Sequence, residues 1–322
     1  MRTPDPDTRP GGVQHVDIGS DRDGQRVDNA LSALLKGVPR SLIYRLVRKG
    51  QVRVNGKRVK PDTRLHAGDT LRIPPVRTAE RNRSEPPPAK ARALEQAVIF
   101  EDRHFLVIDK PSGLASHGGS GVDFGAIELL RAARPDESLE LVHRLDRETS
   151  GVLVLARTRA ALTGLQALIR EGRTTKQYLA LLTGRLARAK FDVNVPLRKS
   201  VLQGGERMVK VTDDGKPSLS FFREIERYAD ASLVEVTLDT GRTHQIRVHA
   251  AHVGHPVAGD SKYGEREVNQ RYRELGLKRL FLHAAHFGFE LDGKAYGFSA
   301  PLPQELVAVL DTLPRARSVR RR

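Results

Sequence analysis

The sequence contains no cysteine and no tryptophan, and aromatic residues make up only 5% of its 322 residues. Without cysteine the chain can form neither disulfides nor thiolate metal sites, and it has no cysteine nucleophile. No apolar run approaches the roughly 20 residues that cross a bilayer, and the start, MRTPDPDTRPGG, lacks the apolar segment of a secretory signal. The scarcity of aromatics disfavours a platform that stacks several single-stranded bases. These absences predict a cytoplasmic protein with no membrane partner.

Positive charge is what the sequence has in excess, with a formal net charge of +16. Between residues 22 and 77 there are 14 Lys and Arg against 4 Asp and Glu, a surplus of ten positive charges. Solubility alone does not require such clustering, which points to a polyanionic partner. No lipidation motif or terminal amphipathic helix accompanies the charge, so nucleic acid is favoured over acidic lipid.

The basic segment, residues 21–78, predicts a small α-α-β module. Apolar residues at helical spacing from Val27 predict one helix, and a turn at Gly37-Val38-Pro39 leads to a second over residues 42–49, with Ser41 as its N-cap. The alternating QVRVNGKRV around Asn55-Gly56 predicts a hairpin. The module is too small to hold an active site, so we interpret it as an RNA-binding module. Its predicted RNA-binding residues are Arg40, Arg45, Arg48, Lys49, Arg53, Lys57 and Arg58.

The rest of the chain divides by composition. Residues 1–20 are predicted to be a disordered tail, residues 79–93 a proline-centred linker, and residues 314–322 a basic tail with five arginines. Residues 94–313 alternate strand-like runs (FLVID, GVLVLA, YLALL, SLVEVTL, QIRVHAA) with few helices, of which one is predicted from near Thr158 to Gly172. Because turns rather than helices join most runs, we expect an α+β domain with a mixed, largely antiparallel sheet.

Four stretches place polar residues beside apolar runs: DKPSGLASHGG, HRLDRETSG, TKQYLALL and TGRTHQIRVH. A metal site must be considered, because histidines crowd between His244 and His255 and recur at His283 and His286. However, no HExxH pattern occurs, and on a strand His244 and Arg247 would point to opposite faces. Structural or RNA-contacting histidines are therefore expected, and no metal. The segment HGGSG has neither the Lys-Ser/Thr of a phosphate-binding loop nor a GxSxG pattern, so it predicts only a loop near the site.

Asp146 in HRLDRETSG is the candidate that remains. A lone Asp at such a loop would be a turn residue, but the whole segment resembles the catalytic signature of the pseudouridine synthases that act on ribosomal and transfer RNA. KPSGL, KQYLAL, GRTHQIRVH and FLHAAH resemble the other motifs of that family, in the same order, and the basic module looks like an S4 RNA-binding domain. The resemblance runs from about residue 22 to residue 313 and implies the pseudouridine synthase fold, with a central active-site cleft.

The resemblance also implies a role for each matching residue. Asp146 would be the catalytic carboxylate, Arg247 its cationic partner, Tyr178 the ring that packs on the target base and Leu282 the apolar floor. Arg144 would fill the space left by a flipped-out uridine or grip the flipped strand; a structural ion pair is its alternative. The implied substrate is 23S rRNA, free or in an assembling subunit, and the implied state is a monomer. An isomerisation needs no cofactor, so none is expected.

Two other hypotheses use the same features. A non-catalytic S4-type RNA-binding or ribosome-assembly protein would explain the charge and the hairpin, but not why Asp146, Tyr178 and Arg247 all stand in motif context. A nucleoside-cleaving hydrolase would also use a carboxylate, but it would not need the basic module.

Overall fold

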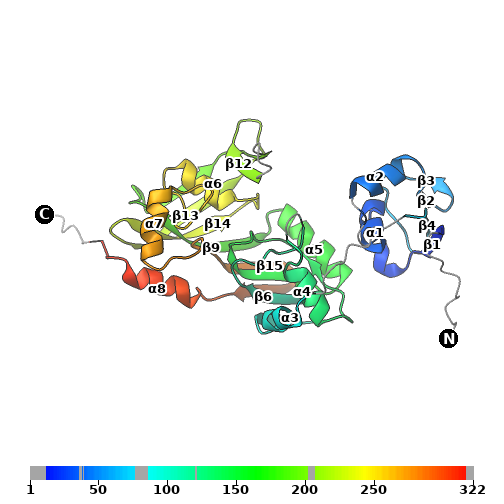
Figure 1. Cartoon of the computed structure of the whole chain (residues 1–322), viewed down its shortest axis with the longest axis horizontal. Helices are drawn as coiled ribbons and strands as arrows, with labels where there is room; N and C mark the ends of the chain where they lie inside the picture. The colour runs from blue at the N-terminus through cyan, green and yellow to red at the C-terminus, as the bar shows by residue number, and fades with distance from the viewer. Residues whose placement is uncertain are drawn as a thin grey trace. The chain divides into compact units, whose positions relative to one another are not determined.

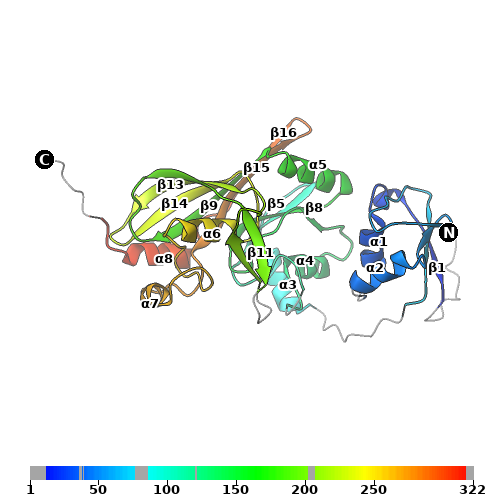
Figure 2. The same ribbon diagram turned by 90° about the horizontal axis from the view of Figure 1, so that it is seen from above.

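The computed structural model describes residues 12–35, 38, 40–76, 86–119, 122–201 and 207–316 (Figures 1 and 2). The chain divides into two compact units, Met1–Ser84 and Glu85–Arg322, and each is considered by itself. Parts of several predicted features lie outside the described residues: the turn at Gly37 and Pro39, the first part of the linker (residues 79–85), the last two residues of HGGSG, and the outer ends of both tails. No helix within the described ranges has the length and apolarity needed to span a membrane.

The smaller unit has two helices on a four-stranded sheet, which confirms the predicted α-α-β module. Asn55 and Gly56 both have positive φ, 49° and 76°, as the tight hairpin between β2 and β3 requires. Leu31, Ile43 and Leu71 are fully buried or nearly so in its core. The elements are β1 (Gln14–Asp17), a 3-10 turn (Ser20–Arg22), α1 (Val27–Leu34), α2 (Arg40–Arg48), β2 (Arg53–Val54), β3 (Lys57–Arg58) and β4 (Thr70–Ile73), with sheet order β1-β4-β2-β3.

Two details of this unit differ from the sequence-based expectation. The prediction of a disordered tail is wrong for Gln14–Asp17, which pairs with β4, and Ile18 just after it is 2% exposed. A four-residue edge strand with a single apolar residue carries no alternating signal, and its stability comes from the partner strand. Ser41 is not an N-cap, because α2 begins at Arg40 and Ser41 lies inside the helix.

The larger unit is built on one large, mostly antiparallel sheet with helices packed against it, which confirms the predicted α+β class. Its order is β10-β13-β14-β9-β15-β8-β6-β5, with β16 on β15 and β7 on β8. Among the described residues only β15 and β8 pair in parallel. The strands are β5 (Val98–Glu101), β6 (Phe105–Lys110), β7 (Glu140–Leu141), β8 (Ser150–Ala156), β9 (Thr174–Thr183), β10 (Lys190–Asn194), β13 (Leu219–Arg227), β14 (Ala231–Leu238), β15 (Leu282–Leu291) and β16 (Lys294–Ser299), beside a separate hairpin of β11 (Leu197–Val201) and β12 (Arg207–Val211).

Helices cover both faces of the sheet around β6 and β8. Leu106 and Leu153 pack toward α3 (Pro88–Glu95) and α4 (Ala126–Ala133), whereas Val107 and Val154 pack toward α5 (Arg159–Arg170). Every residue of β8 is buried, which is why this strand reads as an unbroken apolar run rather than an alternating one. Three further helices, α6 (Gln245–His252), α7 (Arg266–Glu274) and α8 (Gln304–Thr312), accompany β9, β13 and β14 (Figure 1).

Helix α5 confirms the prediction around Thr158, whose hydroxyl caps it by accepting from Ala161 N–H at 3.2 Å. The predicted linker is wrong for its last part, because α3 starts at Pro88, where the missing N–H of proline is not needed. The first residues of the predicted basic tail pair with the larger unit, because Arg315 forms a backbone bridge with Tyr228.

The strand expected in QIRVHAA is also wrong, because this segment forms helix α6. All of Gln245–Ala250 is buried, so no exposed polar stripe reveals the helical period. The apolar residues Ile246, Val248 and Ala250 alternate by chance, and this alternation is typical of a strand.

Candidate active site

The loop between β7 and β8 carries Asp146 and is anchored by its neighbours. Because β7 pairs antiparallel with β8, residues 142–149 form the end of a wide hairpin. Ser116 Oγ donates to the Leu145 carbonyl and accepts from the Leu145 N–H, both at 2.9 Å. Thr149 N–H donates to the Asp146 carbonyl at 3.1 Å. The Asp146 backbone is therefore held on both sides, and its side chain, 21% exposed, lines a pocket.

The KPSGL segment, residues 110–114, is hydrogen-bonded to this loop. Lys110 is fully buried, and its Nζ donates to the carbonyls of Pro111 and Leu114 at 2.8 and 2.7 Å, with Arg147 O at 3.4 Å. Burial lowers the pKa of Lys110 to about 7. Gly113 N–H donates to the Arg147 carbonyl at 2.8 Å. The lysine thus joins the KPSGL turn to the loop of Asp146, which explains why both motifs belong to one site.

Arg247 reaches the pocket from the first turn of α6. Its Nη1 lies 3.6 Å from Asp146 Oδ2, as expected for the predicted pair. Its closer partner is Asp260, which accepts from Nε and Nη2 at 2.7 Å each. Burial opposes the charge of Arg247, but the Asp260 carboxylate outweighs it and raises the arginine's pKa above its ordinary value. Sequence analysis missed Asp260, and its only signal is a carboxylate that follows the apolar segment Val257-Ala258 after one glycine, Gly259.

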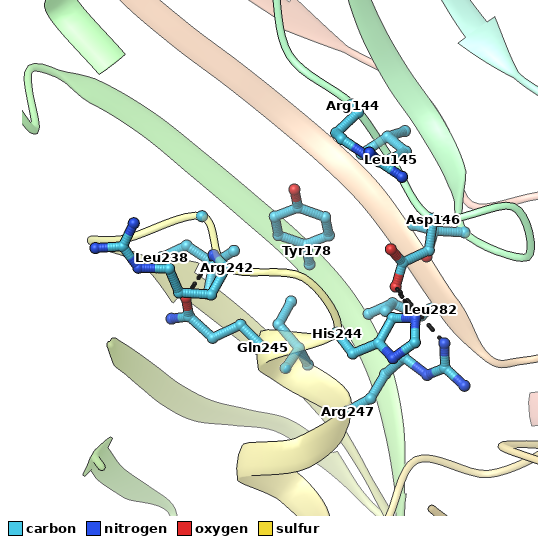
Figure 3. Close-up of a pocket in the computed structure, with 13 residues that line it drawn as sticks. Arg144, Leu145, Asp146, Tyr178, Leu238, Arg242, His244, Gln245, Arg247 and Leu282 are labelled. Carbon is cyan, nitrogen blue, oxygen red and sulfur yellow. Dashed lines mark hydrogen bonds and ion pairs between the residues drawn. The ribbon is translucent and has the colours of Figure 1, made fainter. Parts of the chain in front are cut away.

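Tyr178 and Leu282 form the apolar side of the pocket. Tyr178 on β9 pairs across the sheet with Ala284 on β15, and Leu282 begins that strand and is 3% exposed. Burial raises the pKa of Tyr178, with the charge of Asp146 adding to the effect, so the phenol stays protonated at neutral pH. Figure 3 shows the ring between the loop of Asp146 and the loop that carries Arg242.

Arg144 lies at the rim of the same pocket with its side chain exposed. Within the described part of the chain no carboxylate pairs with it, which argues against the structural ion pair. The pocket also contains four residues of the GRTHQ segment that sequence analysis did not assign to the site: Gly241, Arg242, His244 and Gln245. Gln245 is buried and its Oε1 accepts from Thr240 Oγ1 and from the Arg242 backbone N–H, which fixes this loop (Figure 3).

Two of the other histidines, His283 and His249, serve the fold. His283 is buried and bonds Ser150 Oγ at 2.9 Å and the Ala300 carbonyl at 3.1 Å, and burial lowers its pKa. His249 is buried beside Ser218 Oγ, and burial lowers its pKa to about 4. No group of three or more His, Asp or Glu that could hold a metal ion occurs among the residues with described coordinates.

The smaller unit presents a basic surface. All seven residues predicted to bind RNA have exposed side chains. Two depressions bring five of them together: one contains Arg45 and Arg48 on α2 with Lys49 directly after the helix, and the other adds Arg53 and Arg58. Arg72, which the sequence analysis did not assign, lies in the second depression and donates to the Gln51 carbonyl. Arg40 and Lys57 lie outside both.

Two family models match the chain. Residues 104–252 match an RNA pseudouridylate synthase model, and residues 25–71 match an S4 domain model. The first match contains Asp146, Tyr178 and Arg247, and the second coincides with the basic module.

Curated relatives match over almost the whole chain. Ribosomal large subunit pseudouridine synthase C of Salmonella typhimurium and of Escherichia coli K12 are each 51% identical over 312 residues, covering 95% of this chain and 98% of the relative. The Haemophilus influenzae protein of the same name is 48% identical, with 95% and 96% covered. Among solved structures, human RNA pseudouridylate synthase domain containing 4 superposes with a TM-score of 0.59 at 25% identity, covering 70% of this chain and 95% of that one.

Proposed function

The chain belongs to the RNA pseudouridylate synthase family, and we propose that it isomerises specific uridines of 23S ribosomal RNA to pseudouridine with Asp146 as the catalytic residue. One observation carries the assignment of residues: a single pocket contains Asp146, Arg247, Tyr178 and Leu282, with Arg144 at its rim. These residues come from four separate segments of the chain, and the fold brings all of them into this one pocket. The large-subunit substrate rests on the names of the curated relatives.

The reaction needs a carboxylate more than any other group. The C1′–N1 bond of the uridine breaks, the uracil turns, and a C1′–C5 bond forms; C5 loses a proton and N1 gains one. Atoms and electrons balance without an oxidant or reductant. Asp146 can attack covalently or remove a ribose proton, and both routes require the ionised form. Arg247, with one N–H group 3.6 Å away, supplies permanent positive charge that favours this form.

The pocket suits a base that has left its helix. A stacked uridine cannot reach Asp146, so it must flip out of the RNA. The Tyr178 ring can lie against the uracil, and Leu282 closes the pocket behind it. Arg144 is exposed, has no carboxylate partner among the described residues and stands at the rim, so its planar guanidinium can stack in the space that the base leaves.

The smaller unit would supply affinity rather than chemistry. Its exposed arginines and lysines can neutralise RNA phosphates, and the release of counterions makes such binding depend steeply on salt. A 23S rRNA substrate places the protein in the cytoplasm. That the chain acts as a monomer and without a cofactor stays a prediction; sedimentation of the protein with and without an rRNA fragment tests the first part.

A tritium-release assay tests the proposed function. Large-subunit rRNA is labelled with tritium at uridine C5, and the purified protein is added without metal or nucleotide. Pseudouridine formation releases tritium to water and leaves the RNA chain intact. A non-catalytic RNA-binding protein releases nothing, and a nucleoside-cleaving hydrolase releases free labelled uracil, so either result would refute the proposal. Mapping of pseudouridines in 23S rRNA from a strain without this gene would identify the target sites.

A further inference from the structure

His244 has an unusual backbone for its position. It directly precedes helix α6 with φ 54° and ψ 19°, the left-handed region that residues other than glycine seldom adopt. Its side chain is 14% exposed, and its Nε2 lies 3.8 Å from Asp146 Oδ2 (Figure 3). This distance is longer than a hydrogen bond, and hydrogen bonds within an active site are often long before the substrate binds. Left-handed residues outside glycine concentrate at functional sites, where the surroundings maintain them.

Tyr263 determines which nitrogen of His244 carries the proton. The backbone N–H of Val209 donates to Tyr263 Oη at 2.9 Å, and Tyr263 Oη lies 2.8 Å from His244 Nδ1. One lone pair of the phenol oxygen is thus occupied, and among the described residues Nδ1 is the only acceptor recorded for its proton. Tyr263 therefore donates to Nδ1, which leaves the proton of a neutral imidazole on Nε2, facing Asp146.

The charges around the ring favour this neutral form. Burial lowers the pKa of His244; the carboxylates of Asp146 and Asp260 oppose this effect, and the cations Arg247 and Lys262 reinforce it. Burial also raises the pKa of Tyr263, so the phenol keeps the proton it donates. At neutral pH the edge presented to Asp146 is consequently an uncharged N–H.

We propose that His244 is a positioning residue that, together with Arg247, orients the carboxylate of Asp146. Both residues approach the same oxygen: Nε2 of His244 lies 3.8 Å and Nη1 of Arg247 lies 3.6 Å from Oδ2. Oδ1 is then left to face the nucleotide as nucleophile or base. The inference rests on the proposed function, in which Asp146 is the catalytic residue. Val209 lies on β12, so the hairpin of β11 and β12 positions the hydroxyl of Tyr263. This hydroxyl in turn hydrogen-bonds to His244 Nδ1.

Two substitutions of His244 separate this role from a structural one. In His244→Gln the side-chain amide can reach the position of Nε2 and keep an N–H toward Asp146. In His244→Asn the shorter amide can reach only the position of Nδ1, but Asn tolerates left-handed backbone better than Gln does. A positioning role therefore predicts that Gln is the faster enzyme and Asn the more stable protein, whereas a purely structural role predicts that Asn is better in both respects.

The readouts are the single-turnover rate of tritium release, the Kd for the rRNA fragment and the melting temperature. We expect His244→Asn to be slower than His244→Gln by about tenfold, in the range found for residues that orient a reactive ligand, with Kd unchanged for both. His252→Asn, at an exposed position of the same helix, is the matched control and should keep the wild-type rate. Equal rates for the two His244 variants, or a faster Asn variant, would overturn the inference.

Tyr263→Phe supplies an independent test. It removes the hydroxyl that fixes the tautomer of His244, so the rate of tritium release should fall when the rest of the protein is wild type. The rate should not fall further when His244 is already replaced by Asn. Full additivity of the two losses would count against the proposed chain of contacts. The failure of this inference can be told apart from the failure of the proposed function. If the wild type releases tritium, Asp146→Asn does not, and the two His244 variants have equal rates, the positioning role alone is refuted. Absence of release by the wild type refutes both.

Discussion

Replacement of Asp146 by Asn removes the negative charge and the reactive oxygen while keeping nearly the same shape. Every route to pseudouridine through this pocket needs an ionised carboxylate, so the rate of tritium release should fall at least about 1,000-fold, which corresponds to ~4 kcal/mol of barrier. A reduction of this size is within the range for removal of a general base.

The structure sets the expected effect on stability. Asp146 is 21% exposed, and Arg247 keeps both 2.7 Å hydrogen bonds to Asp260 when Asp146 loses its charge. Stranding one partner of a buried ion pair costs ~3–5 kcal/mol, but here the arginine is not stranded. The free energy of unfolding should fall by only ~1 kcal/mol, as for a partly exposed pair. For a unit of this size that lowers the melting temperature by ~2–4 °C.

The assay combines tritium release, rRNA binding and thermal melting on one preparation. Asp136→Asn, at an exposed position, is the matched control and should behave as wild type in all three. An Asp146→Asn protein that is folded, binds rRNA and still releases tritium within tenfold of the wild-type rate would falsify the catalytic assignment. Tenfold is only ~1.4 kcal/mol, far less than a catalytic carboxylate contributes.

Three further substitutions test other parts of the molecule. Arg144→Ala should reduce turnover on folded rRNA with an unchanged melting temperature, because the side chain is exposed and unpaired among the described residues; equal losses of activity and stability would contradict this role. Asp260→Asn should lower the free energy of unfolding by ~3–5 kcal/mol in denaturant melts, because it removes the bidentate carboxylate partner of a buried arginine and leaves only the more distant Asp146; a loss below ~1 kcal/mol would contradict the pairing. Replacing Arg45 and Arg48 together by Ala should weaken rRNA binding and reduce the slope of log K against log salt by about 2, whereas an unchanged slope would exclude phosphate contacts.

Prediction from sequence was most reliable where the signal is local. The hairpin at Asn55-Gly56 needs positive φ at both positions, and few other residue pairs accept it. The helix capped by Thr158 combines a capping residue with an apolar stripe of helical period. The strand at Gln14–Asp17 could not be found in this way, because its stability comes from hydrogen bonds to β4, which lies more than 50 residues later.

For the site as well, prediction succeeded where the signal lies in short motifs and failed where it depends on burial in the fold. Resemblance at the motif level selected Asp146, Arg247, Tyr178, Leu282 and Arg144, and all five line one pocket. It did not show that the arginine lies on a helix, because Gln245–Ala250 of this helix are all buried and present no polar face to display the helical period.

The sequence by itself determined the charge of the smaller unit, the absence of thiol chemistry and the motifs that specify the family, since each of these is a property of residue types and short spacings. Only the tertiary structure decided the partners: that Arg247 binds Asp260 more closely than Asp146, and that Tyr263 hydrogen-bonds to His244. The physical reason is that these contacts join side chains from separate elements, at distances where a change of one ångström makes or breaks a hydrogen bond. Such positions depend on the packing of the whole sheet and its helices, and no short stretch of sequence records them.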